Sequence, residues 1–448
     1  MGAPFGPVAI LGGVVGLLFA YRYPYALYGL LLILTPFLGL VVSLSTGKLA
    51  IGVRAFGGSI DVGLAELVAM ALVAAWGAKV VMLWWRRNDV NWRPWLPLFP
   101  PVAALVAAHL LSSLSFFNPD ALLVVKYALR PVAWCYVIYV ALTVNLVRSR
   151  RRLERALAAL VFTGMLAAIM GFVSLAAPGA AGGFPRAHPL PVFGVLPLGD
   201  NHNLLAEWLV VTVPATLALL LLSSHPRTRR LLGIAAGFQA AIALLTFART
   251  AWIVLAVEAL CFAWLVWRDR MERWIRPALV GAILLLPLAA LMFTVSSSAL
   301  VASSTSTRVM LSEIALASWK ASPWLGMGAG TFVERVGSTQ VFLIEYGAPL
   351  DAHGWIQKLI AETGLFGIAA AAWLVGAAWQ FAKRTRERLA HRHLELRVFT
   401  LLATGALGAF VYQLFNTSYW SGKLWLPLGL MLAASRALTT EDRTNDGP

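Results

Sequence analysis

The chain has 448 residues, of which 60% are hydrophobic and only 12% are charged, and its mean hydropathy is +0.76. An ordinary soluble chain is about 25% charged because polar groups must cover its surface, so this composition excludes a soluble enzyme and a disordered chain. The two cysteines, Cys135 and Cys261, lie in long apolar runs, and two thiols build neither a disulfide framework nor a zinc site. The composition therefore predicts a protein whose surface mostly faces a bilayer.

The net charge of +16 could indicate a nucleic-acid-binding protein, so the positions of the charges must decide. Short basic segments between apolar runs hold 21 of the 36 Lys and Arg residues, against only 6 of the 20 acids. These segments are 86–94, 148–155, 223–230, 268–276 and 383–397. Basic loops between apolar spans follow the positive-inside rule, so we expect them to be cytoplasmic and expect no nucleic-acid partner.

A transmembrane helix needs about 20 apolar residues. The first candidate run is short and contains three glycines, so we expect it to be a half-span or re-entrant element, and we expect twelve full spans among the rest. In chain order the candidate runs are Pro7–Ala20, Tyr25–Ser45, Val62–Trp85, Trp95–Ser115, Ala121–Val147, Ala156–Ala177, Leu204–Leu222, Leu231–Ala248, Ala251–Trp267, Pro277–Ser296, Leu365–Ala382, Val398–Phe415 and Leu424–Ala437.

The fold class that we predict is an all-α polytopic membrane protein with about 12 transmembrane helices. The stretch between the spans that end near residue 296 and start near 365 can build a periplasmic helical cap. It begins as a Ser/Thr-rich linker, 296–307, and continues as an amphipathic helix, 308–319, that lies at the interface. The expected division is N-terminal transmembrane helices 1–296, cap 297–362, C-terminal transmembrane helices 363–437 and a cytoplasmic tail 438–448.

The candidate functional residues are cations at membrane depth, where a charge is costly in free energy. A charged side chain at membrane depth costs at least about 2.5 kcal/mol by insertion scales, so one that is kept there is a functional candidate. Arg249 occupies a short break between two apolar runs, where it can clamp a phosphate or extend toward lipid phosphates. Lys126 and Arg130 are four residues apart on one helical face, and we expect no acid nearby to pair with them, so the same two interpretations apply.

Two outer segments add weaker candidates. We interpret Arg186 and His188 as solvated loop residues rather than as ligands. Asp200, Asn201 and Asn203 precede an apolar run, where they suit either simple capping or a helix N-terminus that points at an anion.

The richest segment is 308–367. Gly326, Gly328 and Gly330 suit a tight turn, although a glycine repeat alone is a weak signal. His353 follows Asp351 where the cap returns to the bilayer, and an imidazole with a pKa near 6.5 can accept a proton from a hydroxyl there. A structural role for this histidine is equally compatible with the sequence.

These motifs resemble the O-antigen ligase and O-antigen polymerase superfamily of bacterial envelope glycosyltransferases. The resemblance is detailed over 199–415 and is only a hydropathy pattern before that. The matching pieces are Asp-Asn-His-Asn-Leu-Leu-Ala at 200–206, Ala-Arg-Thr-Ala-Trp at 248–252, Arg308 with Trp319 and the Gly-x-Gly-x-Gly-x-Phe turn, and finally His353 with Gln357, Glu362 and Gly364. The sequence departs from the usual pattern at His202, where a proline is common, and at Gly354, where an asparagine usually follows the histidine.

The resemblance implies a GT-C-like enzyme of the bacterial cell inner membrane whose active site faces the periplasm. Its donor would be an undecaprenyl-diphosphate-linked glycan and its acceptor a hydroxyl of lipid A-core oligosaccharide, and no nucleotide sugar, metal or other cofactor would be needed. Arg249 would hold the diphosphate and His353 would be the catalytic imidazole of an inverting transfer. We expect a monomer, with the remaining substrate-binding residues being Arg186, Lys126, Arg130, Arg308, Asn203 and Gln357.

Other functions stay open at this point. An O-antigen polymerase and a protein O-oligosaccharyltransferase of the same superfamily share this chemistry. We favour the ligase because the chain is short and has one modest cap. A non-enzymatic flippase or transporter would need acids along a central path, and the candidates Glu66, Glu207 and Glu258 are few and scattered.

Overall fold

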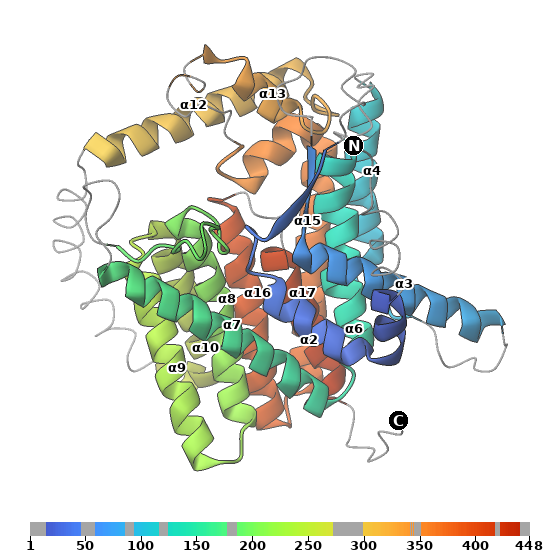
Figure 1. Ribbon diagram of the computed structural model, residues 1–448, viewed down its shortest axis with the longest axis vertical. Helices are drawn as coiled ribbons and strands as arrows, with labels where there is room; N and C mark the ends of the chain where they lie inside the picture. The colour runs from blue at the N-terminus through green and yellow to red at the C-terminus, as the bar shows by residue number, and fades with distance from the viewer. Residues whose placement is uncertain are drawn as a thin grey trace.

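The computed structural model describes residues 15–45, 59–85, 94–115, 124–176, 186–271, 299–340, 342, 344, 351–416 and 422–439 (Figure 1). Helices dominate this part of the chain. They are helix Val15–Arg22, α2 (Pro24–Leu34), α3 (Leu64–Trp85), α4 (Phe99–Ser115), the π-helical η1 (Val125–Trp134) and η2 (Tyr136–Ala141), α6 (Leu142–Leu146), α7 (Arg150–Ala176), α8 (His202–Leu222), α9 (Pro226–Leu245), α10 (Arg249–Met271), α12 (Ala299–Ala321), α13 (Thr331–Gly337), α15 (Trp355–Arg388), α16 (His393–Gln413) and α17 (Gly422–Ala437).

The helices confirm a polytopic membrane protein. Among the described residues, 7 helices are long and apolar enough to cross a membrane, or 8 if the bent pair Val15–Arg22 and Pro24–Leu34 is one span. That pair bends by 110°, as expected of a broken or re-entrant element, although residues 7–14 lie outside the described part. The predicted span at 277–296 also lies outside it, so the count of twelve spans stays a prediction.

One predicted span is wrong. The run 25–45 is not a single helix, because α2 ends at Leu34 and the chain continues as strand β1 (Val41–Ser45), which pairs antiparallel with β2 (Ser59–Gly63). Pro36 and Gly39 interrupt the helix, and the Gly39 N–H donates to the Pro197 carbonyl at 3.0 Å. The hydrophobic run therefore forms two elements of different type.

Helix α8 is the centre of the bundle and packs against α7, α9 and α16. Its residues are buried almost all round, including Trp208, as expected of a helix that is apolar on every face. Small residues allow the close approach of its neighbours: Gly405 of α16 lies against Pro214, and Gly164 of α7 lies against Thr212.

Two ends of the bundle are distinguished by their connections. The α8–α9 connection at 223–225 and the α15–α16 connection at 389–392 lie at the end where we expect the cytoplasm, because both adjoin basic segments. The α9–α10 turn and the segment 351–354 lie at the other end, which α12 and α13 cover (Figure 1).

The covering helix α12 is longer than the sequence predicts. The expected linker 296–307 is helical from Ala299 onward, so most of the Ser/Thr-rich segment belongs to α12. Ser and Thr have low helix propensity, but α12 packs against α15, and tertiary packing overrides that weak preference.

Candidate active site

The candidate site lies at the covered end, where the outer ends of three bundle helices converge. A small apolar cluster joins them: Ala206 and Val210 come from α8, Ala248 and Ala251 from the start of α10, and Tyr412 from the end of α16. The Tyr412 hydroxyl donates to the Asn203 carbonyl at 2.7 Å. This packing fixes the first turns of α8 and α10 beside each other.

Arg249 is placed by a tight turn. Phe247 adopts φ 54° there, which is rare for a large side chain, and its ring packs against that of Trp252 with centroids 5.9 Å apart. The Trp252 indole N–H donates to the Leu244 carbonyl at 3.0 Å. As a result Arg249 is the first residue of α10, and its side chain is exposed rather than buried among apolar spans.

Arg308 of α12 lies close enough to Arg249 for the two positive charges to interact. Burial lowers the pKa of Arg308, the positive charge of Arg249 lowers it further, and Tyr412 opposes the shift. The Arg308 Nε is buried and has no hydrogen-bond partner among the described residues. Two guanidinium groups that repel each other, one with an unused donor, form an arrangement that an anion between them would stabilise.

His353 is half-buried in the segment that enters α15. Burial lowers the pKa of His353 below its ordinary value, the charge of Arg308 lowers it further, and Asp351 acts in the opposite direction. The imidazole is therefore neutral at pH 7 and able to accept a proton, next to a fixed cation.

The packing around Gly354 explains why this chain has a glycine where asparagine usually follows the histidine. Gly354 is in extended backbone, and a Cβ at this position would meet the Leu414 carbonyl oxygen at 2.6 Å. A side chain such as asparagine does not fit there unless α16 moves. The close approach of Gly354 to Leu414 keeps His353 near the end of α16.

A partly buried ion pair fixes the backbone on either side of His353. Lys358 of α15, with a side chain 2% exposed, donates to both carboxylate oxygens of Asp351 at 2.8 and 2.6 Å. Its Nζ also lies 4.6 Å from the centroid of the Tyr127 ring. Asp351 also accepts from the Ala352 N–H at 2.8 Å. We call Asp351 and Lys358 the loop clamp, because they join the segment before His353 to the helix after it.

The glycine repeat attaches the cap to α15. Gly326, Gly328 and Gly330 all have positive φ, which glycine adopts without strain. The Met327 N–H donates to the Ala361 carbonyl at 2.9 Å, and the Gly328 N–H donates to the Glu362 carbonyl at 3.1 Å. The turn therefore uses its backbone donors on α15, as a tight turn would, and does not present them to a ligand.

Glu362 and Gly364 supply the other half of this attachment. The Gly330 N–H donates to the buried Glu362 carboxylate at 3.0 Å. Gly364 kinks α15 at φ 59° and ψ −152°, a conformation essentially restricted to glycine. The kink frees the Leu365 and Phe366 N–H groups to donate to carbonyls of 323–324 at 2.9 and 3.1 Å.

The loop before α8 contributes a further edge of the site. Arg186 is exposed, and its Nη1 lies 3.5 Å from the His202 Nε2. Asn201 caps α8, since its side chain accepts from the Asn203 N–H at 2.9 Å, so the capping interpretation of 200–203 is confirmed. His202, in place of the usual proline, thus has a neighbour in Arg186.

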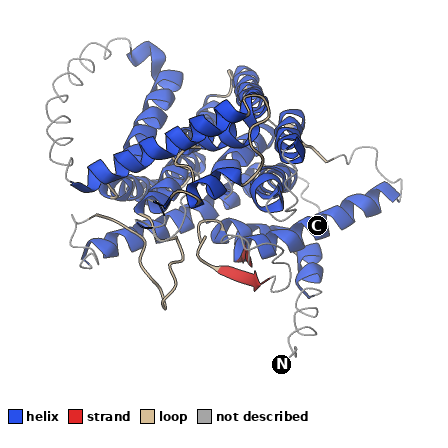
Figure 2. Cartoon of the chain, turned by 90° about the horizontal axis from the view of Figure 1, so that it is seen from above, coloured by secondary structure: helices blue, strands red, loops and turns tan. Residues whose placement is uncertain are grey.

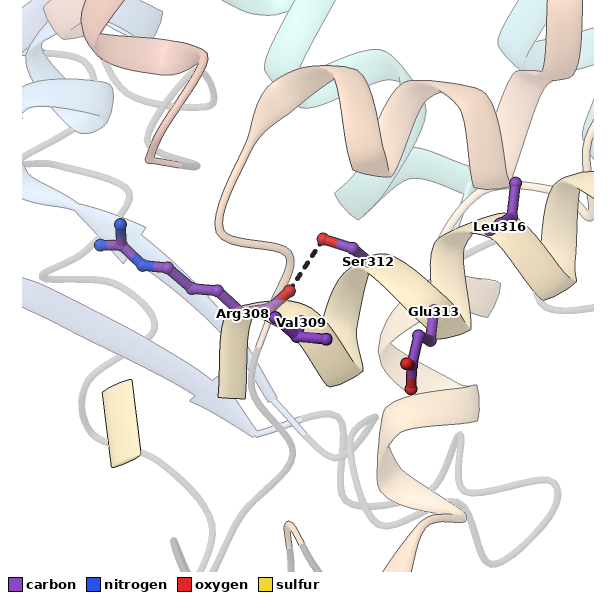
Figure 3. A pocket seen from close by; sticks show the side chains of 5 residues that line it. All are labelled: Arg308, Val309, Ser312, Glu313 and Leu316. Atoms are coloured by element: carbon purple, nitrogen blue, oxygen red, sulfur yellow. Dashed lines mark hydrogen bonds between the residues drawn. The ribbon is translucent and has the colours of Figure 1, made fainter. Parts of the chain in front are cut away.

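Gln357 lies on α15 one turn after His353 and donates to the Ser312 hydroxyl of α12 at 2.6 Å. Its Oε1 is buried without a hydrogen-bond partner among the described residues. A hollow of about 310 Å³ opens beside this contact along α12 (Figure 3). It is lined by Arg308, Val309, Ser312, Glu313 and Leu316, and the Arg308 guanidinium extends away from the helix axis.

Lys126 and Arg130 lie on a different part of the molecule. Arg130 donates to Glu66 of α3 through Nε and Nη2, at 2.7 and 2.6 Å, so the inference that no acid lies nearby is wrong. That acid is 64 residues away in the sequence, and only the packing of α3 beside the π-helical segments brings it close. Lys126 stacks on the adjacent Tyr127 ring at 5.5 Å. Neither side chain has a described contact with Arg249, Arg308 or His353.

Sequence reasoning missed a polar network beneath the site. Lys423 at the start of α17 lies 3.3 Å from the carboxylate of Glu207 and donates to the Leu204 carbonyl at 3.0 Å. Gln413 of α16 donates to the same carboxylate at 2.5 Å. In the sequence, this pair is visible only as one acid, Glu207, and one cation, Lys423, in separate apolar runs. The network ties α16 and α17 to the first turns of α8.

The superfamily comparison agrees with this geometry. Residues 234–372 match the family model described as O-antigen ligase, a region that includes Arg249, Arg308, the glycine turn and His353. No curated protein sequence matches the chain. Its apolar spanning helices and this matching segment support membership of the O-antigen ligase superfamily of membrane proteins.

Proposed function

We propose that the protein is an inverting glycosyltransferase that moves O-antigen polysaccharide from undecaprenyl diphosphate to lipid A-core oligosaccharide at the periplasmic face of the inner membrane. One observation carries this proposal. A neutral, half-buried His353 lies within the field of Arg308, whose charge in turn interacts with that of Arg249. A base and two cations at one covered end of a membrane bundle suit a hydroxyl acceptor and a diphosphate leaving group.

The chemistry needs two things from the protein. The acceptor hydroxyl forms a bond to the anomeric carbon and loses its proton to the imidazole of His353, while the bond from that carbon to the diphosphate oxygen breaks. Negative charge develops on the departing undecaprenyl diphosphate, where Arg249 and Arg308 would stabilise it. A general base of this kind contributes about 10²- to 10⁴-fold in rate. Attack from the face opposite the leaving group inverts the anomeric configuration.

The roles of the remaining candidates follow from their positions. Arg186 and the backbone of Asn203 border the same end of α8 and would contact the donor. Gln357 and the hollow along α12 lie on the other side of Arg308 and would contact the acceptor glycan. Lys126 and Arg130 lie in the π-helical η1, and they would contact the part of the donor that extends to this helix.

The transporter alternative loses support from the ion pairs. Of the three acids on which it depends, Glu66 pairs with Arg130 and Glu207 pairs with Lys423. Acids already paired with cations are poor candidates for a substrate- or proton-conducting path. Glu258 is buried beside Gly408 and has no hydrogen-bond partner among the described residues, so it is the one acid left for that function.

The test is transfer with purified protein in detergent and EDTA, using undecaprenyl-diphosphate-linked glycan as donor and lipid A-core as acceptor. Wild type should form ligated product, while His353→Ala and Arg249→Ala should reduce it by at least 10²-fold. Lys320→Ala is the matched control, because Lys320 is an exposed cation on α12, the helix that carries Arg308.

The outcomes separate the alternatives. Extension of lipid-linked repeat units without ligation to lipid A-core would replace the ligase by the polymerase. Transfer to a protein hydroxyl alone would indicate an oligosaccharyltransferase. Full activity of folded His353→Ala would refute the mechanism, and no turnover with any acceptor would favour the transporter.

A further inference from the structure

A small apolar hairpin projects from the loop that precedes α8. Val192 and Val195 exchange two backbone hydrogen bonds, at 2.7 and 3.0 Å, around the two-residue turn Phe193-Gly194. Both turn residues have positive φ, 49° and 79°. These features define a type I′ turn, which normally takes Asn-Gly because few other residues tolerate positive φ. An aromatic residue at its first position is strained.

The strained residue, Phe193, does not pack against the rest of the described chain. Phe193 is 102% exposed, and Val192 and Val195 are 44% and 42% exposed. The ten residues 189–198 include no charged or polar side chain. A polar turn would have been easier to form and to hydrate, so the apolar tip needs an apolar surrounding that the described chain does not provide.

The loop that carries the hairpin is bonded to the ends of two candidate spans. The His188 N–H donates to the Ser174 hydroxyl at 2.9 Å, in the last turn of α7, and the Ala187 N–H donates to the Leu245 carbonyl at 2.9 Å, at the end of α9. Apolar side chains in these last turns are themselves open to the surroundings, with Phe172 57% exposed and Leu244 46% exposed. Since α7 and α9 are candidate spans, these side chains face lipid.

The attachment of the hairpin fits a lipid surrounding. Seen from above in Figure 2, loops in tan extend sideways beyond the helices of the bundle. The hairpin belongs to the loop that is bonded to the ends of the candidate spans α7 and α9. The exposed tip therefore continues the lipid-facing apolar belt of α7 and α9.

We propose that the hairpin 191–196 inserts Phe193 into the outer leaflet of the membrane as an interfacial anchor. The occupant of this surface is the acyl region of the bilayer, because the tip is uncharged and aromatic and its loop is bonded to the ends of two candidate spans. The anchor holds the segment that carries Arg186 and His202 against the leaflet. This proposal does not depend on the chemistry of the site.

The test is the depth of a spin label in reconstituted vesicles of phosphatidylethanolamine and phosphatidylglycerol. The label is attached at Phe193→Cys in a Cys261→Ser background, where Cys135 stays buried. Asp200→Cys is the matched control, since it is exposed on the polar part of the same loop. The ratio of oxygen to nickel-chelate accessibility should be several-fold higher at residue 193 than at residue 200.

A second label keeps the aromatic tip intact. A label at Val195→Cys should also report an apolar environment, and adding Phe193→Asn, which suits the turn, should move that label toward water. Equal accessibility at residues 193 and 200 would overturn the proposal. So would a Val195→Cys label unaffected by Phe193→Asn, or a label at 193 shielded from both reagents, which would indicate contact with protein instead of lipid.

Discussion

The loop clamp should be asymmetric in its contribution to stability. The side chain of Lys358 is 2% exposed, whereas that of Asp351 is 30% exposed. Asp351→Ala leaves a buried ammonium without its carboxylate, and breaking a fully buried pair in this way costs about 3–5 kcal/mol. Because Asp351 is partly hydrated, we discount the loss to about 2–3 kcal/mol. Lys358→Met leaves an acid that can turn to water, so it should cost about 1 kcal/mol.

The clamp should also control turnover. With the clamp broken, the His353 imidazole is no longer held at the acceptor, and a displacement of about 1 Å can cost about 10²-fold in rate. No described contact joins Arg249 or Arg308 to the clamp, so KM for the donor should stay near the wild-type value while kcat falls. Removing Asp351 also removes the charge that raises the pKa of His353, so the acid limb of the pH–rate profile should move to lower pH.

The assays are thermal unfolding in detergent and steady-state transfer, for both single variants and the double variant Asp351→Ala/Lys358→Met. The double variant should recover most of the stability that Asp351→Ala loses, because no unpaired buried charge remains. The reasoning fails if Asp351→Ala is as stable as Lys358→Met, if the two losses simply add, or if kcat is unchanged while the donor KM rises.

Three further predictions test the surroundings of the site. The neutral imidazole of His353 is the active form and its pKa is lowered, so the pH–rate profile of wild type should have its acid midpoint below the ordinary value of 6.5. Arg308→Gln removes a charge that lowers this pKa and should therefore raise the midpoint. An unchanged midpoint would contradict the role of His353. Gly364→Ala should lower stability by at least about 2 kcal/mol, because φ 59° with ψ −152° excludes a side chain, while Gly376→Ala on the same helix, with open space around it, should change thermal unfolding little. Lys423→Met should cost about 3–5 kcal/mol in thermal unfolding by leaving the Glu207 carboxylate of α8 buried without its cation. Adding Glu207→Gln should restore most of the loss, and a double variant no more stable than the single one would refute the pairing.

The class of the protein could be predicted from the sequence because hydropathy and basic loops report the solvent directly. Long apolar runs with cations between them are inserted in one way whatever their tertiary packing, so the spanning helices α8, α9, α15 and α16 match their predicted positions closely. Local capping was equally readable, since Asn201 bonds to a backbone N–H only two residues away. The order of the motifs around Arg249 and His353 also carried the superfamily resemblance, which the match to residues 234–372 supports.

Only the tertiary structure decided which charges meet. Arg130 reaches an acid 64 residues earlier, and Lys423 reaches one 216 residues earlier, and no local period encodes either pair. The same holds for α12, whose Ser/Thr-rich start becomes helical against α15, and for Gly354, whose lack of a side chain is explained by the Leu414 carbonyl. Hydropathy specifies how each segment meets its solvent, whereas ion pairs and close backbone contacts depend on distances between segments, and those are set when the helices pack.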